Sequence, residues 1–69
     1  RVNCIAPSVT ETDMAQQMDA ESTQLLDQRC ALSGRIQPNE ISDLISFLVS
    51  DGAKNITGQV IRIDQGMPF

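Results

Sequence analysis

Two short apolar runs, one near each end of the chain, limit its fold more than any other feature. Val2–Ala6 is a β-leaning run that Pro7 stops, because proline lacks the N–H that a continuing ladder needs. Gln59–Ile63 is a second run, rich in β-branched residues, that follows Gly58. The segments between them have helical patterns, so we expect parallel strands joined by a right-handed crossover. Since parallel sheets normally have both faces covered, this pair indicates a piece of a larger α/β sheet.

The intervening residues contain one clear helix and one broken helical pattern. We expect an amphipathic helix that has Pro38 at its first position and ends near residues 50–52. Between Asp13 and Ala31 we expect one interrupted helix or two short ones, with Gly34 suited to a helix C-terminus. The apolar stripe of the clear helix has the spacing i, i+3, i+4 and i+7 and consists of Ile41, Leu44, Ile45 and Leu48.

Composition excludes several classes of function. The chain has 69 residues and a net charge of −4, and its five Lys and Arg residues are scattered, so we expect neither nucleic acid nor an anionic membrane as a partner. No apolar run approaches the roughly 20 residues of a membrane span. With no histidine, Ser-His-Asp and Cys-His catalysis are excluded, and the two cysteines make no metal motif. We expect reduced thiols and a cytoplasmic location. Two phenylalanines as the sole aromatic residues predict a thin core.

Three motifs occur in a fixed order along the chain. They are R-V-N-C-I-A-P-S-V-T-E-T-D-M at residues 1–14, G-R-I-Q-P-N-E-I at residues 34–41 and I-T-G-Q-V-I-R-I-D at residues 56–64. Together they resemble the R-V-N-x-I-x-P-G-x-x-x-T-x-M, G-R…P-x-E-I and T-G-x-x-x-x-V-D-G-G segments of the short-chain dehydrogenase/reductase family, nearest to its 3-oxoacyl-[acyl-carrier-protein] reductase-like branch. The resemblance implies α/β structure, namely the C-terminal strand-helix-helix-strand portion of a Rossmann-type doubly wound parallel sheet. Residues 1–69 are then expected to be a C-terminal fragment of a single domain, which the absence of methionine at position 1 also favours.

The resemblance also implies a cofactor and a place for it. Family members transfer hydride between NAD or NADP and a carbonyl or hydroxyl substrate, and the loop after the first strand lies against the nicotinamide half of the cofactor. Carried over to this chain, the Thr10 backbone meets the carboxamide and the Thr12 hydroxyl bonds the carboxamide or the pyrophosphate. The residues alone leave a second interpretation open, a plain turn followed by a helix that Thr12 caps. The candidate cofactor-binding residues are Pro7, Ser8, Val9, Thr10 and Thr12.

The residues that carry out the family's chemistry are absent from this chain. The family uses a serine with a Y-x-x-x-K pair, in which tyrosine is the general acid/base. This chain has no tyrosine, one lysine (Lys54) and no glycine-rich phosphate turn. We therefore assign no catalytic or metal-binding residue and expect the chain alone to be inactive. Glu11 and Asp13 are read as a solvated acid and an acid at a helix start, and Met14 and Met18 as packing residues or the edge of a substrate mouth.

Three departures from the family pattern concern loop geometry. Ser8 replaces a usual glycine, which costs about 1 kcal/mol if that position needs positive φ. The connector at residues 34–38 is one residue shorter than the common form. Gln65 replaces the first glycine of the closing D-G-G.

A second hypothesis treats the chain as a non-catalytic, self-associating module derived from this family. The apolar helix Ile41–Leu48 and the strand Gln59–Ile63 resemble a common subunit interface of the family. An unpaired edge on the first strand can also recruit another strand. We therefore expect a homo-oligomer.

Overall fold

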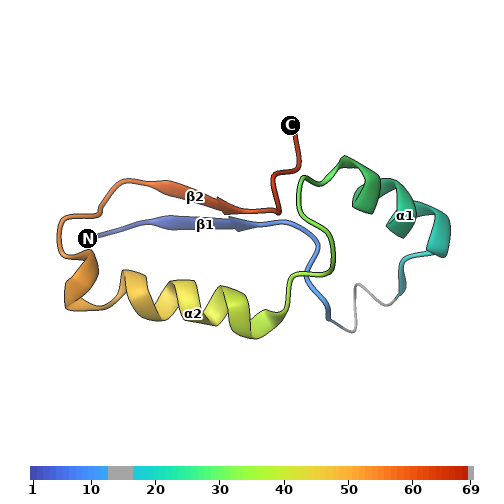
Figure 1. The fold of residues 1–69 in the computed structure, drawn as a ribbon. Coiled ribbons are helices and arrows are strands. Elements are labelled where there is room, and N and C mark those ends of the chain that lie inside the picture. The colour runs from blue at the N-terminus through green and yellow to red at the C-terminus, as the bar shows by residue number, and fades with distance from the viewer. Residues whose placement is uncertain (13–16, 69) are drawn as a thin grey trace.

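The computed structural model describes residues 1–12 and 17–68 and shows a two-stranded parallel sheet with helices (Figure 1). The strands pair in register from Cys4 opposite Val60 to Pro7 opposite Ile63. Helix α2 runs along one face of the pair, and α1 lies beyond the carboxyl ends of both strands (Figure 1). The predicted α/β class and the parallel crossover are confirmed. The elements in chain order are β1 (Cys4–Pro7), α1 (Ala20–Arg29), α2 (Pro38–Leu48), the short 3-10 helix η2 (Asp51–Ala53) and β2 (Val60–Ile63).

Strand β1 begins and ends later than the sequence predicts, and it includes Pro7. The N–H groups of Cys4 and Ser8 donate to carbonyls of the β2 segment, at 2.8 Å and 3.1 Å. Alternate N–H groups of a strand point to opposite sides, so the nitrogen of Pro7 faces away from β2. Proline is tolerated there because no ladder bond is lost, as at an edge strand.

The amino ends of the two strands are joined by the side chain of Asn3. Its Nδ2 donates to the Ile56 carbonyl at 3.1 Å, and its Oδ1 accepts from the Gln59 N–H at 3.0 Å. Beside it, the Gly58 N–H donates to the Val2 carbonyl at 2.8 Å, and Gly58 has a φ of 72°. The R-V-N and T-G motifs, more than fifty residues apart, are therefore the two halves of one hydrogen-bonded junction.

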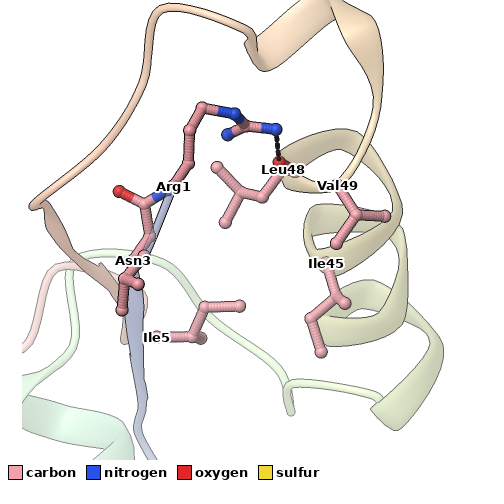
Figure 2. Close-up of a pocket in the computed structure, with 7 residues that line it drawn as sticks. Arg1, Asn3, Ile5, Ile45, Leu48 and Val49 are labelled. Carbon is pink, nitrogen blue, oxygen red and sulfur yellow. Dashed lines mark hydrogen bonds between the residues drawn. The ribbon is translucent and has the colours of Figure 1, made fainter.

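Arg1 holds the C-terminal end of α2 against this junction. Its guanidinium donates to the carbonyls of Leu48 and Ile56, each at 2.9 Å (Figure 2 shows the first of these bonds). Leu48 is the last residue of α2. A cation at this end also interacts favourably with the helix dipole.

The core is as thin as the composition predicts. Among the described residues, the buried hydrophobic side chains are Ile36, Leu48 and Ala53. The radius of gyration is 13.8 Å, whereas a compact chain of this length has roughly 11 Å. Helix α2 covers the face of the sheet that carries Ile5, while Val60 is 68% exposed.

Helix α2 begins as its sequence favours, but one helix end was predicted wrongly. Pro38 opens α2, and the Gln37 N–H donates to the Glu40 carboxylate at 3.1 Å. Gly34 does not end a helix, because α1 ends earlier with Cys30 as its extended cap. Gly34 has a φ of 94° and instead turns the connector between the helices.

Helix α1 lies within residues 13–31, the region for which one interrupted helix or two short ones were predicted. It begins after Asp19, whose carboxylate accepts from the Ser22 N–H at 2.6 Å. The predicted helix start at Asp13 and the position of Met14 lie outside the described residues. The question whether Thr12 caps a helix therefore stays open.

We predict that Asn3→Ala lowers the free energy of unfolding by about 1–2 kcal/mol, because the Gln59 N–H and the Ile56 carbonyl each lose a partner. Chemical denaturation of the chain measures this. Asn39→Ala on the exposed surface of α2 is the matched control and is expected to cause no loss, since alanine is the better helix former. Equal destabilisation by both substitutions would contradict the junction.

We predict that the start of α1 loosens in acid. Hydrogen bonds from the Ser22 backbone N–H, and then from its side chain, hold the pKa of the Asp19 carboxyl below its ordinary value of 3.8. A lowered folded-state pKa means that the cap stabilises α1 above the ordinary value and is lost as the pH falls through the lowered one. Carbon chemical shifts of Ser22 and Thr23 report this transition. Asp19→Asn keeps a capping oxygen that does not titrate, so a transition that persists in this variant would refute the assignment.

Candidate functional site

The candidate site lies at the carboxyl edge of the sheet, where both strands end. Loop 8–12 leaves β1 there, and the turn 64–66 leaves β2 beside it. The Ser8 N–H donates to the Ile63 carbonyl at 3.1 Å and fixes the start of the loop against β2. In open parallel sheets, ligands bind outside the carboxyl ends of the strands. The fold therefore places this loop where a ligand is expected.

A third segment completes the edge. It is the connector between α1 and α2, residues 30–37. Ile36 is 3% exposed and forms a parallel bridge with Thr10. The Ile36 carbonyl accepts from the Glu11 N–H at 2.7 Å, and Arg35 Nε lies 4.0 Å from a Glu11 carboxylate oxygen. Sequence reasoning did not assign Ile36 to the site. The sequence feature that could have indicated it is an isolated apolar residue between the polar residues of the connector.

The structure keeps the five sequence-predicted residues together in one stretch. Pro7 is the last residue of β1, and Thr12 is exposed. Ser8, Val9 and Thr10 are half-buried, and the Thr10 hydroxyl donates to the Ser8 carbonyl at 3.1 Å. The N–H groups of Val9 and Thr10 donate to no other described residue, so both donors are available to a ligand.

Two residues replace glycines of the family pattern, and backbone strain occurs at Gln65 and not at Ser8, where it was suspected. Ser8 does not have a positive φ, so serine carries no such cost there. Among the described residues other than glycine, Gln65 alone has one, at 59°. Its side-chain Nε2 donates to the Gly34 carbonyl at 2.9 Å, and its own carbonyl accepts from the Leu32 N–H at 3.0 Å. Gln65 thus joins the turn after β2 to the connector.

A hollow lies elsewhere in the described part of the chain. It has a volume of about 460 Å³ and opens between β1 and α2, toward the amino end of β1 (Figure 2). Apolar side chains of the strand and the helix form most of its wall, and two nitrogens of the Arg1 guanidinium are bonded to main-chain carbonyls. We therefore interpret this hollow as part of the surface at which the helix packs against the sheet. The lining residues are Arg1, Val2, Asn3, Ile5, Ile45, Leu48 and Val49.

A second hollow of about 320 Å³ follows α1. Met18 lines it, which leaves both predicted roles of this methionine, packing and substrate mouth, open. Its other lining residues are Ser22, Leu25, Leu26 and Arg29.

The candidate site offers main-chain hydrogen-bond donors, and its described acid has a charged partner. Glu11 is paired with Arg35, in keeping with a loop acid, and Asp13 lies outside the described residues. Lys54 caps η2, a segment that precedes the amino end of β2, whereas loop 8–12 follows the carboxyl end of β1. Within residues 1–12 and 17–68, no cluster of His, Cys, Asp or Glu could hold a metal ion, and no helix is long and apolar enough to cross a membrane. Among the described residues, this edge offers main-chain N–H groups to a ligand.

Comparisons with known proteins agree with the fold and with the motifs. A family described as enoyl-(acyl carrier protein) reductase matches residues 1–68. The 3-oxoacyl-[acyl-carrier-protein] reductases of Thermotoga maritima and Chlamydia trachomatis are 37% and 40% identical over 97% of this chain and 27% of their own lengths. A tropinone reductase homolog of Arabidopsis thaliana is 41% identical over 97% of this chain and 26% of its own length.

A solved structure supports the same grouping. The crystal structure of a 3-oxoacyl-[acyl-carrier protein] reductase from Brucella melitensis superposes with a TM-score of 0.92 at 27% identity, over 97% of this chain and 25% of the other. The chain thus spans about a quarter of the length of the relatives that it matches. Its motifs, its parallel strand pair and these matches together show that it belongs to the short-chain dehydrogenase/reductase family.

Proposed function

We propose that this chain forms the nicotinamide-side part of the cofactor site in an NAD- or NADP-dependent oxidoreductase that acts on a carbonyl or hydroxyl substrate. The observation that carries the proposal is the placement of loop 8–12 at the shared carboxyl edge of two parallel strands, with the N–H groups of Val9 and Thr10 available there. This is the position at which such sheets bind nucleotides.

The residues present fit the carboxamide end of a nicotinamide. A carboxamide offers an acceptor oxygen and a donor nitrogen, so it pairs with main-chain N–H and carbonyl groups. Val9 and Thr10 supply the donors, and Thr12 is an exposed residue of the same loop. When bound, the cofactor supplies the hydride. The loop holds the carboxamide and so fixes the orientation of the ring.

Proton transfer is assigned to residues outside this chain. The chain has neither tyrosine nor histidine, and its one lysine, Lys54, is the cap of η2. The relatives' names include 3-oxoacyl-[acyl-carrier-protein] reductase and a tropinone reductase homolog. Since these names differ in substrate, the proposal extends to the carbonyl/alcohol class and no further.

We predict that the chain binds reduced nicotinamide mononucleotide weakly and that Thr12→Val weakens this binding about three- to tenfold, the effect of losing one hydrogen bond. Amide chemical shifts recorded during a titration measure both effects, and the changes are expected at residues 8–12 and 35–36. Thr23→Val on α1 is the matched control and should bind like the unmodified chain.

The same samples test whether the chain lacks catalysis. With NADPH and a carbonyl substrate, the chain alone is expected to leave the nicotinamide absorbance band unchanged. Turnover above the blank would contradict the assignment of proton transfer to residues outside the chain. Shift changes spread over the whole chain, or none at all, would count against the cofactor site.

Self-association is a second candidate function, favoured by exposed apolar side chains on α2, at its C-cap and on β2. Phe47 is 48% exposed, Val49 76% and Val60 68%. Side chains of this kind are typical of subunit contacts when they are contiguous. We propose that they contribute to a homo-oligomer through helix Ile41–Leu48 and strand Gln59–Ile63.

We predict that Phe47→Lys raises the dissociation constant of this oligomer about tenfold or more, because a charge replaces an aromatic side chain that the proposed interface would bury. Sedimentation at micromolar concentration measures it. Val2→Lys is the control, since Val2 is 80% exposed but lies outside the proposed interface. A monomeric unmodified chain, or equal effects of the two substitutions, would refute this interface.

A further inference from the structure

The turn after β2 holds a residue in a conformation that its side chain disfavours. Gln65 has a φ of 59°, in the left-handed region that glycine occupies without cost. Such a conformation persists in a folded protein when surrounding contacts fix it, and it often marks a clamp or a ligand site. The contacts of Gln65 therefore show what the strain supports.

Gln65 holds the connector by its main chain and its side chain. Its carbonyl accepts from the Leu32 N–H at 3.0 Å, and its Nε2 donates to the Gly34 carbonyl at 2.9 Å. Glycine at this position would relieve the strain and keep the first bond, but it would lose the second. The hydrogen bond from the side-chain amide to Gly34 is therefore the contact that glutamine makes here and glycine would not.

The residues beside Gln65 make the turn a firm support. The Gly66 N–H donates to the Asp64 carboxylate at 3.0 Å, and Asp64 is ion-paired with Arg62. A Cβ placed on Gly66 would lie 2.7 Å from the Ala31 Cβ, so the turn and the connector are in close contact. The connector is therefore in contact with a turn that has hydrogen bonds and an ion pair of its own.

From Gly34 the connector leads directly to the candidate site. The next two residues, Arg35 and Ile36, are those that contact Glu11 and Thr10. We propose that Gln65 is a positioning residue for loop 8–12: its side-chain amide fixes Gly34, and thereby the bond between the Ile36 carbonyl and the Glu11 N–H. The link to a nicotinamide rests on the function proposed above, whereas the link to loop geometry does not.

Amide hydrogen exchange of the chain tests the positioning role, with the Glu11 N–H as reporter and the Cys4 N–H, bonded to the Gln59 carbonyl, as internal control. Gln65→Glu keeps the length but removes the donor, and Gln65→Gly removes the strain and the donor together. Both are expected to speed exchange at Glu11 about tenfold, as loss of one hydrogen bond predicts, while leaving Cys4 unchanged. Gln65→Lys restores a donor and is expected to restore slow exchange.

The results at Gln65→Gly separate positioning from simple stability. We expect its midpoint of unfolding to stay close to that of the unmodified chain, because the relieved strain offsets the lost hydrogen bond, while Glu11 still exchanges faster. Unchanged Glu11 exchange in both Gln65→Glu and Gln65→Gly would overturn the proposal, as would equal acceleration at Glu11 and Cys4.

Titration with reduced nicotinamide mononucleotide then tests the link to the ligand. Weaker binding by Gln65→Gly with recovery in Gln65→Lys supports it, and unaltered affinity despite faster Glu11 exchange overturns it. If the unmodified chain shows no binding, the proposed cofactor site fails, while the exchange data still decide whether Gln65 positions the loop.

Discussion

The parallel pairing of β1 with β2 is the interaction on which the rest of the structure depends. It joins residues at the two ends of the chain, and it aligns both carboxyl ends at one edge. The pairing is held at its amino end by Asn3 and at its carboxyl end by the bond from Ser8 to Ile63. Without it, loop 8–12 and the turn 64–66 would share no edge, and no candidate site would exist.

The candidate site is an edge built from three segments, and each has a different support. Loop 8–12 is carried by β1, the turn 64–66 by β2, and the connector by the bonds that it makes to the other two. With few buried side chains, hydrogen bonds carry an unusually large share of the order at this edge. Small losses there are therefore expected to change the loop before they unfold the chain.

The motif residues have clearer structural roles than a motif match alone indicates. Arg1 and Asn3 act on the carbonyl of Ile56, in the motif at the other end of the chain. Of the two replaced glycines, Ser8 fits an ordinary backbone, whereas Gln65 occupies the left-handed region and uses its side chain in return. Whether a residue that departs from a family pattern strains the backbone thus depends on the backbone angle at that position.

The sequence by itself determined the strand–helix–helix–strand order, the parallel crossover and the start of α2 at Pro38, whereas the cofactor role of loop 8–12 stays a prediction. These follow from local periodicity, proline chemistry and ordered motifs, which depend on residues close together in the chain. Tertiary structure alone decided that β1 extends to Pro7, that Gly34 turns a connector, and that Ile36 and Gln65 shape loop 8–12. These outcomes depend on which hydrogen-bond partner lies opposite each residue, and that is set by contacts between segments some 25 to 56 residues apart, which local patterns do not encode.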